Sequence, residues 1–175
     1  MKKHFLLKWV YTALCLATAL VLPFLTGQIP QIGAMLCPMH LPVLLCGFLC
    51  GPAYGAVVGF TAPLLRSFIF FLPPLFPAAV AMAFEMATYG LLAGVLYRTF
   101  PKTVPCLYGA LLAAMAGGRV VWGAVQFLFS GLFHTGFSFS AFLAGAVTQA
   151  VPGILLQILL VPALVLALKR AKLLF

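Results

Sequence analysis

The chain alternates long apolar stretches with short clusters of basic residues, and this alternation restricts it to a membrane fold. Eight of the ten lysine and arginine residues lie in three clusters: Lys2, Lys3 and Lys8; Arg98 and Lys102; and Lys169, Arg170 and Lys172. The intervening stretches are long enough to cross a bilayer an even number of times, so that every cluster can lie on the cytoplasmic face. This is the positive-inside pattern of proteins that cross the membrane several times.

The composition agrees with a membrane fold and limits the number of crossings. With 65% hydrophobic and 6% charged residues, the chain cannot cover a water-soluble core with polar surface. A helical crossing of about 30 Å of hydrocarbon needs about 20 residues, so the chain has room for roughly six spans and no soluble domain. The basic clusters are accounted for by cytoplasmic loops and anionic lipid, so nucleic acid is not an expected partner.

Proline and glycine pairs divide the apolar sequence into spans. Gly51-Pro52 and Pro73-Pro74 predict helix ends, and Pro152-Gly153 predicts a kink within the last span. An odd number of spans would place the first or the last basic cluster outside. We therefore expect an all-α membrane protein in which residues 1–175 form a single six-helix domain with both termini cytoplasmic. The expected spans are 8–25, 40–50, 52–71, 76–97, 106–129 and 139–168.

Three charged residues fall inside the apolar stretches, where ionisable groups are costly and usually functional. They are Arg66, Arg119 and the only acid of the chain, Glu85. Counting along the spans places all three near the membrane midplane or in its outer half, and places His40 just beneath the outer surface.

Helical spacing extends this set. Tyr89 lies four residues after Glu85, and Trp122 and Gln126 share a face with Arg119. Gln149 adds an amide at similar depth, whereas Gln157 lies deeper. The predicted substrate-binding residues are Arg66, Glu85, Arg119, His40, Tyr89, Trp122, Gln126 and Gln149.

Two interpretations of the charged residues stay open. In one, they line a polar pocket open to the outside, in which the arginines take a carboxylate or phosphate and Glu85 takes a hydroxyl, amide or cation. In the other, Glu85 pairs with one arginine only to hold helices together. The glutamines and aromatic residues allow the same two interpretations, ligand binding or helix packing.

Several chemistries lack their usual groups. The chain has no Asp or Asn, no HExxH, no P-loop and no pair of carboxylates, so metal-assisted hydrolysis and ATP hydrolysis are not expected. We expect no metal and no cofactor. A single acidic residue is also too few for a typical proton-coupled carrier, so the energy for any transport would come from another chain.

A series of short motifs along nearly the whole chain resembles the substrate-binding (S) components of energy-coupling factor (ECF) vitamin transporters. In order, they are residues 39–48, Gly51-Pro52, Gly55, residues 63–67, residues 73–77, residues 81–85, Tyr89-Gly90, Gly118-Arg119, Pro152-Gly153-Ile154 and Gln157. The motifs are most similar to the branch that contains predicted pantothenate and other vitamin S components.

This resemblance implies a small binder of a water-soluble vitamin or related micronutrient in a prokaryotic plasma membrane. The expected partners are a transmembrane coupling subunit and two ATPase subunits, and the S component is expected to topple in the membrane to release its substrate inside. Ala13 and Ala17 match the alanine pair that meets the coupling subunit in the family. The external segments 26–39 and 130–138 would gate the pocket.

Pantothenate suits a pocket with two arginines, and riboflavin-like or pyridoxine-like compounds are also compatible. Two other classes of function stay open at this point. One is a small membrane enzyme that acts on a lipid or prenyl substrate with Glu85 and His40 as acid and base. The other is a membrane assembly subunit that binds no ligand.

Overall fold

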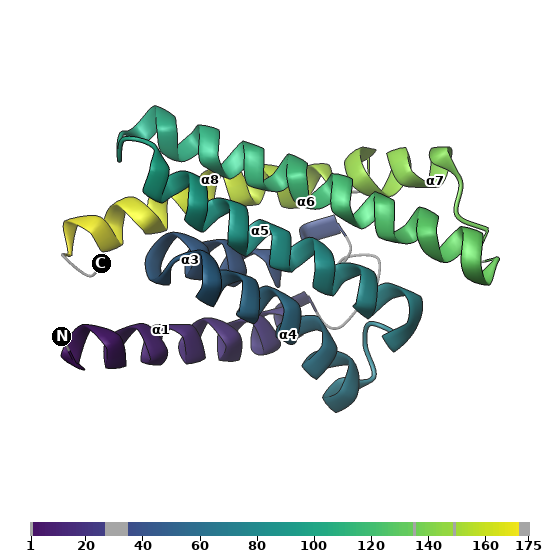
Figure 1. The fold of residues 1–175 in the computed structure, drawn as a ribbon, viewed down its shortest axis with the longest axis horizontal. Coiled ribbons are helices and arrows are strands. Elements are labelled where there is room, and N and C mark those ends of the chain that lie inside the picture. Colours follow the sequence, from purple (N-terminus) through teal and green to yellow (C-terminus); the bar gives the residue numbers. More distant parts are fainter. Residues whose placement is uncertain (1, 27–34, 135, 149, 172–175) are drawn as a thin grey trace.

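The computed structural model describes residues 2–26, 35–134, 136–148 and 150–171, and over these ranges the chain is helical without strands. Figure 1 shows the helices running side by side along the long axis of the molecule. In chain order they are α1 (Lys2–Val21), η1 (Leu22–Thr26), α3 (His40–Cys50), α4 (Pro52–Phe70), η2 (Leu75–Ala79), α5 (Val80–Thr99), α6 (Val104–Phe133), α7 (Phe139–Leu143), η3 (Ala144–Thr148) and α8 (Val151–Arg170).

Five helical stretches in the described part of the chain are long and apolar enough to cross a membrane, at residues 5–25, 52–70, 75–99, 104–133 and 139–170. This confirms a helical protein that crosses the membrane several times. The sequence predicted six spans, and the remaining one is α3, which has only 11 residues. At 1.5 Å per residue α3 is about 16 Å long, roughly half of the hydrocarbon thickness.

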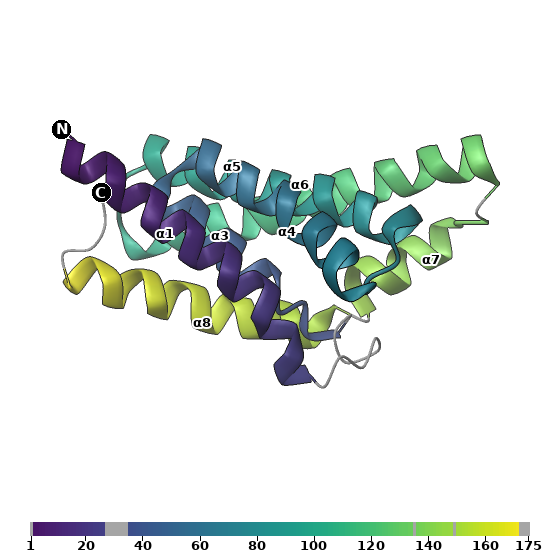
Figure 2. The ribbon, with the colours of Figure 1, turned by 90° about the horizontal axis from the view of Figure 1, so that it is seen from below.

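The described ends of the chain lie at the same end of the bundle, as Figures 1 and 2 show. Two contacts join other segments there: Arg98 Nη2 donates to Cys50 O (2.9 Å), and Lys169 Nζ donates to Lys102 O (2.9 Å). The described residues of the three basic clusters therefore gather at one end of the bundle.

The predicted helix breaks at Gly51-Pro52 and before Pro73 are confirmed. Gly51 has φ +109°, which favours glycine, and Pro52 begins α4, where its missing N–H is not needed. Phe71 ends α4 in the left-handed conformation with φ +58°.

Other boundaries differ from the prediction. Helix α6 continues to Phe133 instead of ending at Phe129, because Gly131 alone costs too little to stop a helix. The regular helix of the fourth span begins at Val80, after the turn η2 in which Phe76 is extended. Helix α8 begins at Val151, shortly after η3, and Pro152 lies in its first turn; Gln149, next to the predicted kink at Pro152-Gly153, lies outside the described residues.

Glycines hold α3, α4 and α5 in close contact. A Cβ added at Gly59 would meet the backbone of Met86, and one at Gly90 would meet the backbone of Gly55. A Cβ at Gly47 would lie 2.5 Å from Gly90 O. Small residues allow such close approach in membrane helices, and these contacts fix the depth of α3 and α4 relative to α5.

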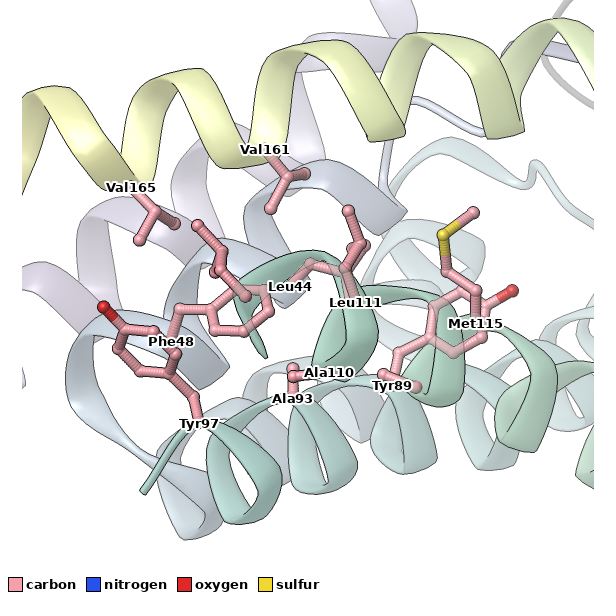
Figure 3. Packing of buried hydrophobic residues seen from close by; sticks show 12 residues of the cluster. Leu44, Phe48, Tyr89, Ala93, Tyr97, Ala110, Leu111, Met115, Val161 and Val165 are labelled. Carbon is pink, nitrogen blue, oxygen red and sulfur yellow. The ribbon is translucent and has the colours of Figure 1, made fainter. Parts of the chain in front are cut away.

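One of two buried hydrophobic clusters lies between α3, α5, α6 and α8, and the other lies between α1, α3, α4 and α5. Figure 3 shows side chains from the four helices of the first cluster converging, with Val161 and Val165 pointing from α8 toward the other three. The buried residues of this cluster are Leu44, Phe48, Tyr89, Ala93, Tyr97, Leu107, Ala110, Leu111, Ala114, Met115, Val161 and Val165. This apolar layer occupies the half of the bundle nearer the basic end and supports a polar group that lies directly beyond it.

Candidate functional site

An ion pair between α5 and α6 forms the centre of the polar group. Arg119 Nη1 lies 3.0 Å from Glu85 Oε1, and the side chains are 16% and 2% exposed. Glu85 is the only acid of the chain, so this pair uses the only carboxylate that a side chain can offer. Because two charges in an apolar interior are costly unless they are paired, the pair couples α5 to α6 at this level.

His40 joins the pair from the first turn of α3. Its Nε2 lies 3.6 Å from Glu85 Oε1, and its ring meets the ring of Tyr89 edge-on with centroids 5.1 Å apart. The sequence placed His40 just beneath the outer surface. The structure places it at the level of Glu85, because α3 is so short that its first residue lies about 15 Å from its end at Cys50.

Cys37 contacts the same group from the residues that precede α3. Arg119 Nη2 donates to Cys37 Sγ at 3.5 Å. Burial raises the pKa of the Cys37 thiol, although the Arg119 guanidinium lowers it. The sulfur is therefore a neutral thiol at physiological pH, and it does not add a second negative charge beside Arg119. The sequence gave no signal for Cys37, because cysteines in apolar segments usually serve packing.

Several polar atoms of this group are buried without a hydrogen-bond partner. They are His40 Nδ1 and Nε2, Glu85 Oε1 and Arg119 Nε. The charged groups of Glu85 and Arg119 are thus within ion-pair distance, but their geometry is not that of a hydrogen bond. Buried polar groups are hydrogen-bonded in the great majority of cases, so this cluster of exceptions makes the group around Glu85 the candidate site.

Arg66 does not join this group. Gly59 of α4 packs against Met86, so Arg66 lies seven residues, or roughly 10 Å, farther along the helix than the level of Glu85. Its Nη1 donates to Leu20 O (2.7 Å), and its guanidinium lies 5.2 Å from the ring of Phe24 and 5.3 Å from that of Phe70. Figure 1 shows α1 and α6 on opposite sides of α3 and α5, so the two arginines serve different sides of the bundle.

The remaining predicted residues lie farther out. Trp122 packs on the rings of Phe137 and Phe142, with centroids 5.5 and 6.1 Å away, so it faces α7 rather than Glu85. Gln126 is half-buried one turn farther along α6. Gln149 lies outside the described residues. Ala13 and Ala17 are both exposed on α1, which lies in front of α3 and α4 in Figure 2.

The residues around Glu85 offer few ligands for a metal ion. Within the described ranges, no three His, Cys, Asp or Glu side chains are arranged so that they could hold one. The donors that do converge are an imidazole, a carboxylate, a guanidinium and a phenol ring, which suit hydrogen bonding to an organic ligand.

Comparison with known proteins identifies the family. The family model described as "ECF transporter, substrate-specific component" matches residues 7–165, which is most of the chain. No curated protein and no solved structure matches the chain. Members of this family are transporter subunits that associate with an ECF module of transmembrane coupling and ATPase subunits. The chain therefore belongs to the substrate-specific components of ECF transporters, and it is a membrane-embedded transporter subunit rather than an enzyme.

Proposed function

We propose that this S component captures a water-soluble vitamin or related micronutrient at Glu85, Arg119 and His40, with pantothenate as the first candidate. The observation that supports the proposal is the set of polar atoms on these three side chains that are buried without a hydrogen-bond partner. A ligand that supplies the missing partners would recover the free energy lost by their burial.

The unpartnered atoms define the chemistry of the ligand. Glu85 Oε1 requires an N–H or O–H donor, Arg119 Nε requires an acceptor, and both ring nitrogens of His40 require partners. Pantothenate carries two hydroxyls and an amide as donors, and a carboxylate and carbonyl as acceptors. In this proposal Arg119 takes the carboxylate and Glu85 takes a hydroxyl.

The other predicted residues have separate roles in this proposal. Tyr89 supports His40 through its ring contact, and Trp122, Gln126 and Gln149 belong to the outer side of the site. Arg66 holds the end of α1 against α4 rather than contacting the ligand, because its hydrogen bond and both of its ring contacts are to that side.

The proposal includes a topology and a set of partners. Both termini are cytoplasmic in a prokaryotic plasma membrane, α3 is the sixth, short crossing, and substrate enters from outside. A coupling subunit packs on α1 at Ala13 and Ala17, and two ATPase subunits energise the toppling that releases substrate inside. The support is the gathering of basic residues at one end and the open face of α1.

Ligand identification tests the binding role. The purified chain is analysed by native mass spectrometry for a co-purified small molecule and titrated with labelled pantothenate, riboflavin and pyridoxine. We expect wild type to bind one of them and Arg119→Met to bind it at least tenfold more weakly. Wild-type protein that binds none of the three and carries no small molecule would refute the proposal and favour an assembly subunit.

Co-purification with the coupling subunit tests the partner surface. The double substitution Ala13→Leu/Ala17→Leu should abolish co-purification while vitamin binding by the isolated chain is kept. Ala163→Leu/Ala167→Leu is the matched control, because these alanines are also exposed, four residues apart and on a membrane helix. Equal loss of the partner in both double variants would contradict the assignment of α1.

A further inference from the structure

Gln157 on α8 carries a buried amide that none of the contacts described around Glu85 explains. It is only 2% exposed, and its Oε1 has no hydrogen-bond partner. A glutamine that joins two helices would bond to the neighbouring helix, and this side chain leaves its oxygen unused in an apolar interior. Its position relative to the candidate site decides whether a ligand can supply the missing donor.

Helix α8 lies beside α3 and the residues that precede it. At the start of α8, a Cβ added at Gly153 would lie 2.8 Å from Leu36 O. Two turns farther along, Val161 belongs to the same buried cluster as Leu44 and points from α8 toward it (Figure 3). The start of α8 therefore lies beside the turn before α3, and its middle lies beside α3 itself.

These two contacts bracket Gln157 on α8 and His40 on the facing segment. Gln157 lies midway between Gly153 and Val161, four residues from each, and so on the same face of α8. His40 begins α3 and lies along the chain between Leu36 and Leu44, the residues that those two contacts reach.

Depth measured from the basic end is an independent measure of the level of Gln157. Gln157 precedes Lys169 by 12 residues, which is about 18 Å of helix, and Glu85 precedes Arg98 by 13, which is about 20 Å. The amide therefore lies at the level of the carboxylate and on the face of α8 that is turned toward the core.

We propose that Gln157 contacts the vitamin and determines its specificity, by accepting a hydrogen bond from an N–H or O–H group of the ligand. This inference rests on the proposed function. With Gln157 the site offers two oxygen acceptors, the other being Glu85 Oε1, and both need donors from the ligand. It follows that the site selects a molecule with at least two N–H or O–H donors, and rejects a simple carboxylate that has none.

The substitution Gln157→Met tests this role, because methionine has a similar length and no amide. We expect binding of labelled pantothenate to weaken about tenfold, the effect of one lost hydrogen bond. The melting temperature of the ligand-free variant should equal or exceed that of wild type, since an unsatisfied polar group has been removed. Ile158→Met, the neighbouring residue on α8, is the control for altered packing and should change neither value.

Two results would overturn the inference. One is pantothenate affinity of Gln157→Met within twofold of wild type. The other is a ligand-free melting temperature lowered by more than about 4 °C, which would assign Gln157 to packing. Pantothenol, in which a hydroxymethyl group replaces the carboxylate, separates the contacts: it should bind wild type more weakly, and Gln157→Met should lose the same factor for it as for pantothenate.

Failure of the inference is distinguishable from failure of the proposed function. If wild type binds a vitamin and Gln157→Met binds it equally well, only the role of Gln157 is wrong. If wild type binds none of pantothenate, riboflavin and pyridoxine and carries no small molecule, the proposed function is wrong, and the role of Gln157 falls with it.

Discussion

The ion pair between Glu85 and Arg119 allows a test that separates a structural role from a binding role. Replacing Arg119 by methionine leaves the Glu85 carboxylate buried at 2% exposure without its guanidinium. Breaking a buried pair in this way typically costs about 3–5 kcal/mol. We expect the lower end, about 3 kcal/mol, because Arg119 is 16% exposed and its contact is not aligned as a hydrogen bond.

The expected cost is large enough to measure in detergent. For a chain of this size, 1 kcal/mol shifts the melting temperature by about 2–4 °C, so Arg119→Met should melt roughly 6–12 °C below wild type when ligand-free. The double variant Glu85→Met/Arg119→Met removes both charges and should regain nearly all of this loss, since an apolar pair of similar volume is often neutral or better. The double variant should be stable and should not bind the vitamin.

Arg66 supplies the matched control for this cycle. Arg66→Met loses one hydrogen bond and two contacts with aromatic rings, worth about 2–3 kcal/mol together, and Glu85→Met should not relieve that loss. The reasoning is refuted if Glu85→Met/Arg119→Met is as unstable as the sum of its single variants, or if it binds the vitamin as wild type does. The first result would mean that the charges are not coupled, and the second that the ligand binds elsewhere.

Three further predictions follow from particular contacts. Gly90→Ala should lower the free energy of unfolding by about 3 kcal/mol, because its Cβ would meet the backbone of α4. Gly109→Ala, whose Cβ meets nothing within 4 Å, should raise the free energy of unfolding by about 1 kcal/mol. Thermal unfolding of the two variants checks both values. Gly131→Cys should react with an impermeant maleimide added outside intact cells and Lys102→Cys should not, in a background with native cysteines replaced; the reverse pattern would invert the topology. His40→Leu removes two unpartnered nitrogens, so titration should show vitamin affinity about tenfold lower without a loss of ligand-free stability.

The sequence predicted the membrane fold, the helix breaks and the central residues because each has a local signal. The break at Gly51-Pro52 follows from backbone chemistry, and Glu85, Arg119 and His40 stand out because few ionisable residues occur in the apolar stretches. The depth of a residue in the membrane can be counted along its helix from the basic clusters. This count placed Glu85 and Arg119 at similar depths.

The sequence could not predict which face of each helix meets which neighbour. Arg66 has the same residue type as Arg119 and a similar place along its span, yet the structure turns it toward Leu20 O on α1. The sequence placed Gln157 deeper than Gln149, but its burial and its unpartnered Oε1 could not be predicted, because both depend on which face of α8 meets the core.

Under the proposed function, the short length of α3 links the fold to the charge of the ligand. A full-length span would place its N-terminal end at the membrane surface, where water would screen the positive end of the helix dipole. In α3 that end lies at the level of Glu85 and no side chain caps it, although His40 N–H donates to Cys37 O and Pro42 has no N–H to contribute. Discontinuous helices in membrane transporters direct N-terminal ends at anionic groups of their substrates in the same way. Under the proposed function, Arg119 and the start of α3 are two sources of positive potential against a single carboxylate, and this balance would favour an anion over a cation.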